Sequence, residues 1–112
     1  MKKSDDLSYI KDIIDAIDRI NIYTEGVTKS TFFEHLMMQD ATMHQIEIIG
    51  EASNQISDTF RDVHPDLPWM EMRAIRNKIV HDYRGIELEI IWDTVKNNLP
   101  GLKDQIKSLL ES

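Results

Sequence analysis

The stretch DDLSYIKDIIDAIDRINIYT, residues 5–24, decides the fold class. Its isoleucines recur at three- and four-residue steps, so on a helix they gather on one face while the acidic side chains occupy the others. The stripe consists of Ile10, Ile13, Ile17 and Ile20. Ser4 is a candidate N-cap, and Glu25-Gly26 is a suitable end. The spacing therefore predicts an amphipathic helix over residues 5–24.

The same periodicity continues after a loop and new cap at residues 28–31. It predicts a long helical stretch over residues 31–60, with a break near Gln39-Asp40. The expected inward positions are Leu36, Met43, Ile46, Ile49, Ile56 and Phe60. Gly50 lies inside this pattern, and we expect it at a close contact between helices.

Two prolines within residues 64–68 form the clearest interruption, and they predict a helix start near Pro68. Further helices are expected over residues 69–80 and 87–98, the latter with Ile90, Ile91 and Val95 inward. A bend is expected at residues 98–101, followed by helix to the end of the chain. The pattern predicts an all-α bundle of four to five helices, in a single domain covering residues 1–112.

The charge of the chain is unevenly distributed. The net charge is −7, which on its face argues against nucleic acid as a ligand. Residues 73–84 nevertheless carry Arg73, Arg76, Lys78 and Arg84 against Asp82, a net charge of +3, so the remainder carries −10. We expect the basic island to bind one or two phosphates, and the acidic remainder to face a basic protein partner.

The sequence contains no cysteine, as is usual for a cytoplasmic protein, and this excludes disulfides and thiolate metal sites. Residues 1–6 are polar, so we expect no signal peptide. The longest apolar runs have two or three residues, and no membrane span is expected.

The segment Arg76-Asn77-Lys78-Ile79-Val80-His81-Asp82-Tyr83 concentrates chemically reactive side chains. An arginine is a permanent planar cation that suits phosphate, and a histidine exchanges protons near neutral pH. RNA cleavage without a metal ion needs both functions. On a continuous helix Arg76 and His81 would lie about 140° apart, given 100° per residue. They can reach one phosphate only if the helix loosens, or if a symmetric dimer supplies the complement.

By spacing alone, Arg-x4-His is a weak pattern. The alternative to a catalytic role is a structural one: His81 and Arg84 interact favourably with the dipole at the end of a helix, and Arg76 pairs with an acidic side chain.

The segment resembles the Arg-x4-His-x-Tyr signature of the HepT toxins in the HEPN superfamily. The similarity extends to residues 48–52, residues 66–69 and residues 88–100, and so covers nearly the whole chain. It implies a HEPN-type helical bundle that dimerises with both motifs at a shared cleft. It also implies a metal-independent endoribonuclease that needs no cofactor, with Arg76 and His81 as the catalytic pair.

The resemblance further implies a partner, the nucleotidyltransferase antitoxin MNT, which transfers AMP to the tyrosine that corresponds to Tyr83. A bulky charged adenylate there would block the cleft and repel RNA. Asn77 and Lys78 are candidates for polar support, and Glu51 for orienting Arg76 or His81. The alternative function is that of a non-catalytic HEPN subunit that binds a nucleotide or the partner enzyme. A purely structural dimer is the third function considered.

No metal site is expected, because His35, His44 and His64 lack ligand spacing and Glu47 with Glu51 fits a solvated helix face better. The tryptophans Trp69 and Trp92 are expected to pack rather than to stack on bases.

Overall fold

The computed structural model describes residues 3–74 and 88–111. Within these ranges the chain is helical and has no strand, so the predicted all-α class is confirmed. Residues 69–74 are also helical. The other helices are α1 (Lys3–Thr24), α2 (Lys29–Glu34), α3 (Leu36–Gln55), α4 (Asp58–Val63), α6 (Leu88–Asp93), a π-helical segment (Thr94–Asn98) and α7 (Leu99–Glu111).

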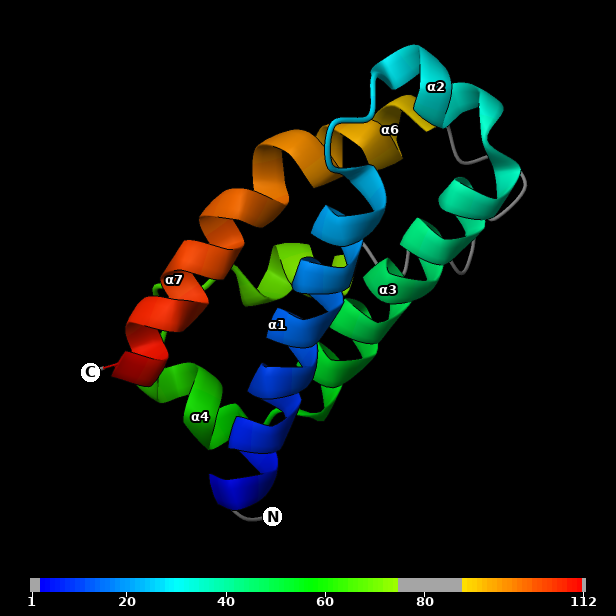
Figure 1. The fold of residues 1–112 in the computed structure, drawn as a ribbon. Coiled ribbons are helices and arrows are strands. Elements are labelled where there is room, and N and C mark those ends of the chain that lie inside the picture. The colour runs from blue at the N-terminus through cyan, green and yellow to red at the C-terminus, as the bar shows by residue number, and fades with distance from the viewer. Residues whose placement is uncertain (1–2, 75–87, 112) are drawn as a thin grey trace.

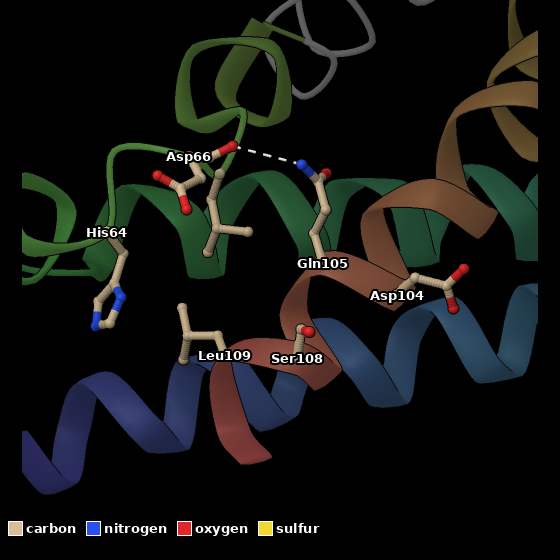
Figure 2. A pocket seen from close by; sticks show the side chains of 7 residues that line it. His64, Asp66, Asp104, Gln105, Ser108 and Leu109 are labelled. Carbon is tan, nitrogen blue, oxygen red and sulfur yellow. Dashed lines mark hydrogen bonds between the residues drawn. The ribbon is translucent and has the colours of Figure 1, made fainter. Parts of the chain in front are cut away.

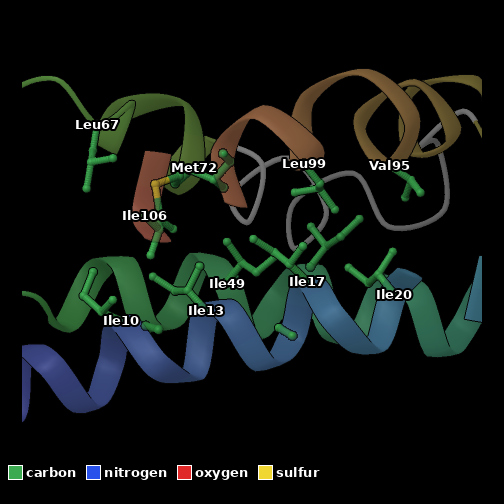
Figure 3. Close-up of a cluster of buried hydrophobic side chains, with 14 of the residues drawn as sticks. Ile10, Ile13, Ile17, Ile20, Ile49, Leu67, Met72, Val95, Leu99 and Ile106 are labelled. Atoms are coloured by element: carbon green, nitrogen blue, oxygen red, sulfur yellow. The ribbon is translucent and has the colours of Figure 1, made fainter. Parts of the chain in front are cut away.

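The two longest helices, α1 and α3, run antiparallel and make the most extensive contact between elements (Figure 1). The short helix α2 closes the end at which they connect. The described segments after α3 form a second layer on one side of this pair, and α7 packs against α1 (Figures 1 and 3).

The core lies between these two layers. The predicted isoleucine stripe of α1 is fully buried, as are Ile46 and Ile49 of α3 (Figure 3). The second layer contributes the buried side chains of Leu67, Trp69, Met72, Ile91, Val95, Leu99, Leu102 and Ile106. At about 25 cal/mol for each Å² of apolar surface, burial of these side chains is the main stabilising contribution to the fold.

The start of α1 differs from the prediction. The helix begins at Lys3, so Ser4 lies inside it and is not the N-cap. The first-turn acid Asp6 is buried and accepts hydrogen bonds from the Ser57 amide (2.9 Å) and hydroxyl (2.8 Å). Because Ser57 is itself the N-cap of α4, this carboxylate joins the starts of two helices. The predicted end is confirmed, since Gly26 adopts a left-handed φ of 69°.

The long helix predicted over residues 31–60 is wrong as one element. It breaks at His35 rather than near Gln39-Asp40, because the extended His35 backbone ends α2 and its Nδ1 accepts from the Met38 amide at 3.1 Å, capping α3. A second break follows at Ile56, where Ser57 caps α4. Leu36, expected inward, is 74% exposed because it begins α3 at this break. Gly50 is buried, and its expected close contact between helices stays a prediction.

The C-terminal part continues as helix where a bend was predicted. Pro100 has no N–H and would clash with the carbonyl of Lys96 in a regular α-helix. The backbone instead widens to a π-helix over Thr94–Asn98, in which the Leu99 N–H donates to the Thr94 carbonyl. Ile91 and Val95 are buried as predicted, whereas Ile90 is exposed. None of the helices in residues 3–74 and 88–111 is long and apolar enough to span a membrane.

Candidate functional site

The motif predicted to carry the chemistry falls within residues 75–87, outside the described residues. Arg76, Asn77, Lys78, His81 and Tyr83 therefore stay sequence-based predictions. The structure describes both flanks of this segment, and it describes Glu51 of the predicted site.

The upstream flank is the helix at residues 69–74. It starts where Pro68 predicts, with the Met72 amide donating to the Pro68 carbonyl at 3.1 Å. The Trp69 ring is buried, and its Nε1 donates to the His64 carbonyl at 2.9 Å. Met72 is 1% exposed. Trp69 thus packs, as predicted, and the chain enters the motif from a helix fixed on the core.

This helix also contacts α3. The Nε of Arg73 donates a hydrogen bond to Oδ1 of Asn54 at 2.7 Å, and both residues are exposed. Asn54 lies in the last turn of α3. The contact joins residues 19 positions apart, and it fixes which side of α3 faces the segment that leads to the motif.

Glu51 lies three residues before Asn54 on α3. Residues three apart share a helix face, so Glu51 lies one turn from the residue that binds Arg73. Glu51 is exposed and takes part in a polar interaction of its own. Its position is compatible with the predicted orienting role toward Arg76 or His81, which remains a prediction.

The downstream flank is α6. The Trp92 ring packs against Phe32, with centroids 5.2 Å apart, and the Lys96 Nζ lies 4.8 Å from the Trp92 ring centroid. Lys96 also donates to the Thr24 carbonyl at the end of α1, at 3.4 Å. Trp92 therefore packs as predicted, and the chain returns from residues 75–87 to a firmly anchored helix.

Two surface pockets formed by the described residues have carboxylates in their walls. A pocket of about 550 Å³ lies between residues 64–67 and α7 (Figure 2). Its wall includes the carboxylates of Asp66 and Asp104, and Gln105 Nε2 donates to the Asp66 carbonyl at 3.4 Å. A groove of about 330 Å³ between α1 and α3 contains Asp12, Glu47 and Glu51. Negative potential in both hollows disfavours a polyanion such as RNA.

The described histidines have local surroundings of their own. His35 caps α3, and the His64 ring contacts the Phe60 ring with centroids 4.6 Å apart and an interplanar angle of 44°. His44 is exposed in the groove between α1 and α3. In the described part of the chain, no three His, Asp or Glu side chains are grouped closely enough to hold a metal ion. Glu47 and Glu51, considered above as two candidate ligands of one cation, form no group with a third His, Asp or Glu among the described residues.

Comparison with known proteins adds to this geometry. The sequence model of the family described as "Ribonuclease HepT-like" matches residues 13–109, a range that includes the motif. A protein of Thermococcus cleftensis named "Probable ribonuclease HepT" is 38% identical over 101 residues, covering 90% of this chain and 92% of the relative.

Two further relatives carry names that assign RNase activity provisionally. One, from Methanocaldococcus jannaschii, is 33% identical over 96% of this chain and 98% of the relative. The other, from Caldanaerobacter subterraneus, is 30% identical over 92% of each chain. No solved structure matches the chain significantly.

Proposed function

Because the chain belongs to the HepT-like ribonuclease family, we propose that it is a metal-independent endoribonuclease, the toxin of a HepT/MNT toxin–antitoxin pair. The observation that carries the proposal is that the family match over residues 13–109 includes an intact Arg-x4-His-x-Tyr motif, Arg76, His81 and Tyr83. The proposed substrate is RNA and the proposed active species is a homodimer.

The proposed reaction is a transesterification. A general base takes the proton of a ribose 2′-OH, the 2′-oxygen bonds to phosphorus, and the bond to the 5′-oxygen breaks as that oxygen receives a proton from a general acid. His81 is the proton-transfer group, and the Arg76 cation stabilises the negative charge that develops on the phosphoryl oxygens. One chain has one such histidine, so a second copy would supply the other proton-transfer group at a shared cleft.

The charge distribution supports this assignment. Residues 73–84 have a net charge of +3, while the two pockets described above have carboxylates in their walls. A phosphodiester is therefore expected to bind near the motif rather than in these pockets.

Cleavage of RNA tests the proposal directly. The purified protein should cut RNA in the presence of EDTA. His81→Ala should lower the rate by at least about 100-fold through loss of acid–base catalysis. Arg76→Ala should lower it by about 100- to 1,000-fold through loss of electrostatic stabilisation of the phosphoryl oxygens, and neither variant should change the helical circular dichroism. His44→Ala is the matched control, because His44 is exposed on the α1–α3 groove, and its rate should equal that of the parent.

Equal rates for His81→Ala and the parent would contradict the catalytic assignment. A parent protein that binds ATP or its partner enzyme but cuts no RNA would instead favour the non-catalytic binding subunit.

The proposed regulation is transfer of AMP from ATP by an MNT-type antitoxin. The Tyr83 hydroxyl attacks the α-phosphorus of ATP, pyrophosphate leaves, and the hydroxyl proton passes to solvent or a base. Intact mass after co-expression with the neighbouring nucleotidyltransferase should increase by whole AMP units. Tyr83→Phe should abolish the increase, whereas Tyr9→Phe should retain it. Loss of the increase in both variants, or in neither, would contradict Tyr83 as the modified residue.

A further inference from the structure

Arg73 is an exposed cation that is oriented by a neutral side chain. Its Nε donates to Asn54 Oδ1 at 2.7 Å, and this is its one hydrogen bond among the described residues. An amide oxygen fixes the plane of the guanidinium without cancelling its charge. With Nε occupied, the two terminal nitrogens Nη1 and Nη2 form the fork that matches two oxygens of a phosphate.

Four other cations of the described part have partners that occupy or neutralise them. Lys29 pairs with Glu89 and Lys103 with Asp18, each at 2.5 Å, and Arg61 pairs with Asp58. Lys96 covers Trp92 and donates to a carbonyl. Arg19 makes no such pair, but it lies in a groove with Asp12 and Asp15.

Arg73 has no carboxylate within ion-pair distance in the described ranges. It is the first residue of the basic island, three positions before Arg76 in the sequence. It therefore combines three properties of a phosphate-binding arginine: an orientation set by Asn54, a charge that no described carboxylate pairs with, and a sequence position three residues before a predicted catalytic residue.

We propose that Arg73 binds a backbone phosphate of the RNA outside the cleaved linkage, and that Asn54 is the positioning residue that holds its guanidinium. This inference rests on the proposed function for the identity of the ligand. The competing interpretation is that the hydrogen bond only ties residues 69–74 to α3.

Salt dependence separates the two interpretations. Each phosphate contact to a single strand contributes about 0.7 to the slope of log affinity against log salt concentration. The probe is a fluorescent single-stranded RNA with 2′-O-methyl riboses, which has no 2′-OH and so cannot be cleaved by transesterification. Its Kd is measured by anisotropy over a range of salt concentrations.

Arg73→Gln should weaken binding and reduce the magnitude of the slope by about 0.7. Arg19→Gln removes the same charge from an exposed position on α1 and should leave the slope unchanged. Asn54→Ala should raise Kd in the parent but have no further effect in Arg73→Gln, because residues that act as a unit are not additive.

Asn54→Asp is the sharpest variant. A carboxylate there keeps the acceptor and makes the hydrogen bond charge-assisted, so a purely structural tie should be retained or strengthened. A phosphate-binding Arg73 would instead be neutralised, and the Kd should rise at least as much as in Arg73→Gln. Thermal unfolding of each variant shows that the fold is intact.

An unchanged Kd and slope in Arg73→Gln and Asn54→Asp would overturn the inference, as would absence of RNA binding by the parent. Cleavage of unmodified RNA is scored separately. If the parent binds as expected but never cleaves, the phosphate contact stands and the proposed catalysis fails. If the parent cleaves and Arg73→Gln binds with the parent's slope, the proposed function stands and this inference fails.

Discussion

The two sides of α3 are built by different rules. The side facing α1 presents Met43, Ile46 and Ile49 to the core, and it would accept other apolar side chains of similar volume. The exposed positions in the C-terminal half of α3 include Glu51, which lines the α1–α3 groove, and Asn54, whose Oδ1 accepts from Arg73 Nε. The buried positions stabilise the bundle, whereas Asn54 is proposed to hold Arg73 for RNA binding. Substitutions at the buried positions should therefore change the free energy of unfolding, and substitution of Asn54 should change the affinity for RNA.

The largest expected effect on stability is at the centre of the α1–α3 contact. Ile17 is fully buried in the layer between α1, α3 and the second layer. Ile17→Ala removes buried methyl groups and leaves a cavity, so it should lower the free energy of unfolding by about 2–5 kcal/mol. Urea unfolding followed by circular dichroism measures this, and the RNA-cleavage rate per folded molecule should stay unchanged.

Ile22→Ala is the matched control, since Ile22 lies on the same helix and is 73% exposed. Its effect should stay within about 0.5 kcal/mol. Equal losses at both positions would contradict the assignment of Ile17 to the core.

A smaller effect is expected where α1 meets α4. Asp6→Ala removes the carboxylate that accepts from the Ser57 amide and hydroxyl. The loss of charge-assisted hydrogen bonds at a part-buried site should cost about 1–3 kcal/mol of unfolding free energy. Asp15→Ala, at an exposed position of the same helix, should cost less than about 0.5 kcal/mol. If the two variants unfold at the same urea concentration, the Asp6–Ser57 contact does not stabilise the junction.

The contrast between buried apolar positions and specific polar contacts also explains which features could be predicted from the sequence. The α1 stripe was predictable because the three- and four-residue steps between Ile10, Ile13, Ile17 and Ile20 match the helical period. The break at His35 was not, because a histidine rarely serves as an N-cap, and its role depends on the Nδ1 contact to the Met38 amide. Pro100 predicted a bend because spacing rules do not foresee that a π-helical turn can accommodate it.

The candidate site shows a similar limit. The motif was readable because its reactive side chains are consecutive in the sequence. The pair Arg73 and Asn54 was not, since a hydrogen bond between residues 19 positions apart depends on how the helix at residues 69–74 lies on α3. A partial signal existed, because Asn54 follows Glu51 on one helix face and Arg73 begins the basic island.

We propose that the motif carries the chemistry, whereas the α1–α3 core carries the stability. The two roles are separated by the RNA-cleavage rate per folded molecule, in EDTA, of His81→Ala beside Ile17→Ala. His81→Ala should unfold like the parent and lose at least about 100-fold in rate. Ile17→Ala should unfold at a lower urea concentration and cleave at the parent's rate. Parent-like cleavage by His81→Ala, or a comparable loss of rate in both variants, would contradict this division of roles.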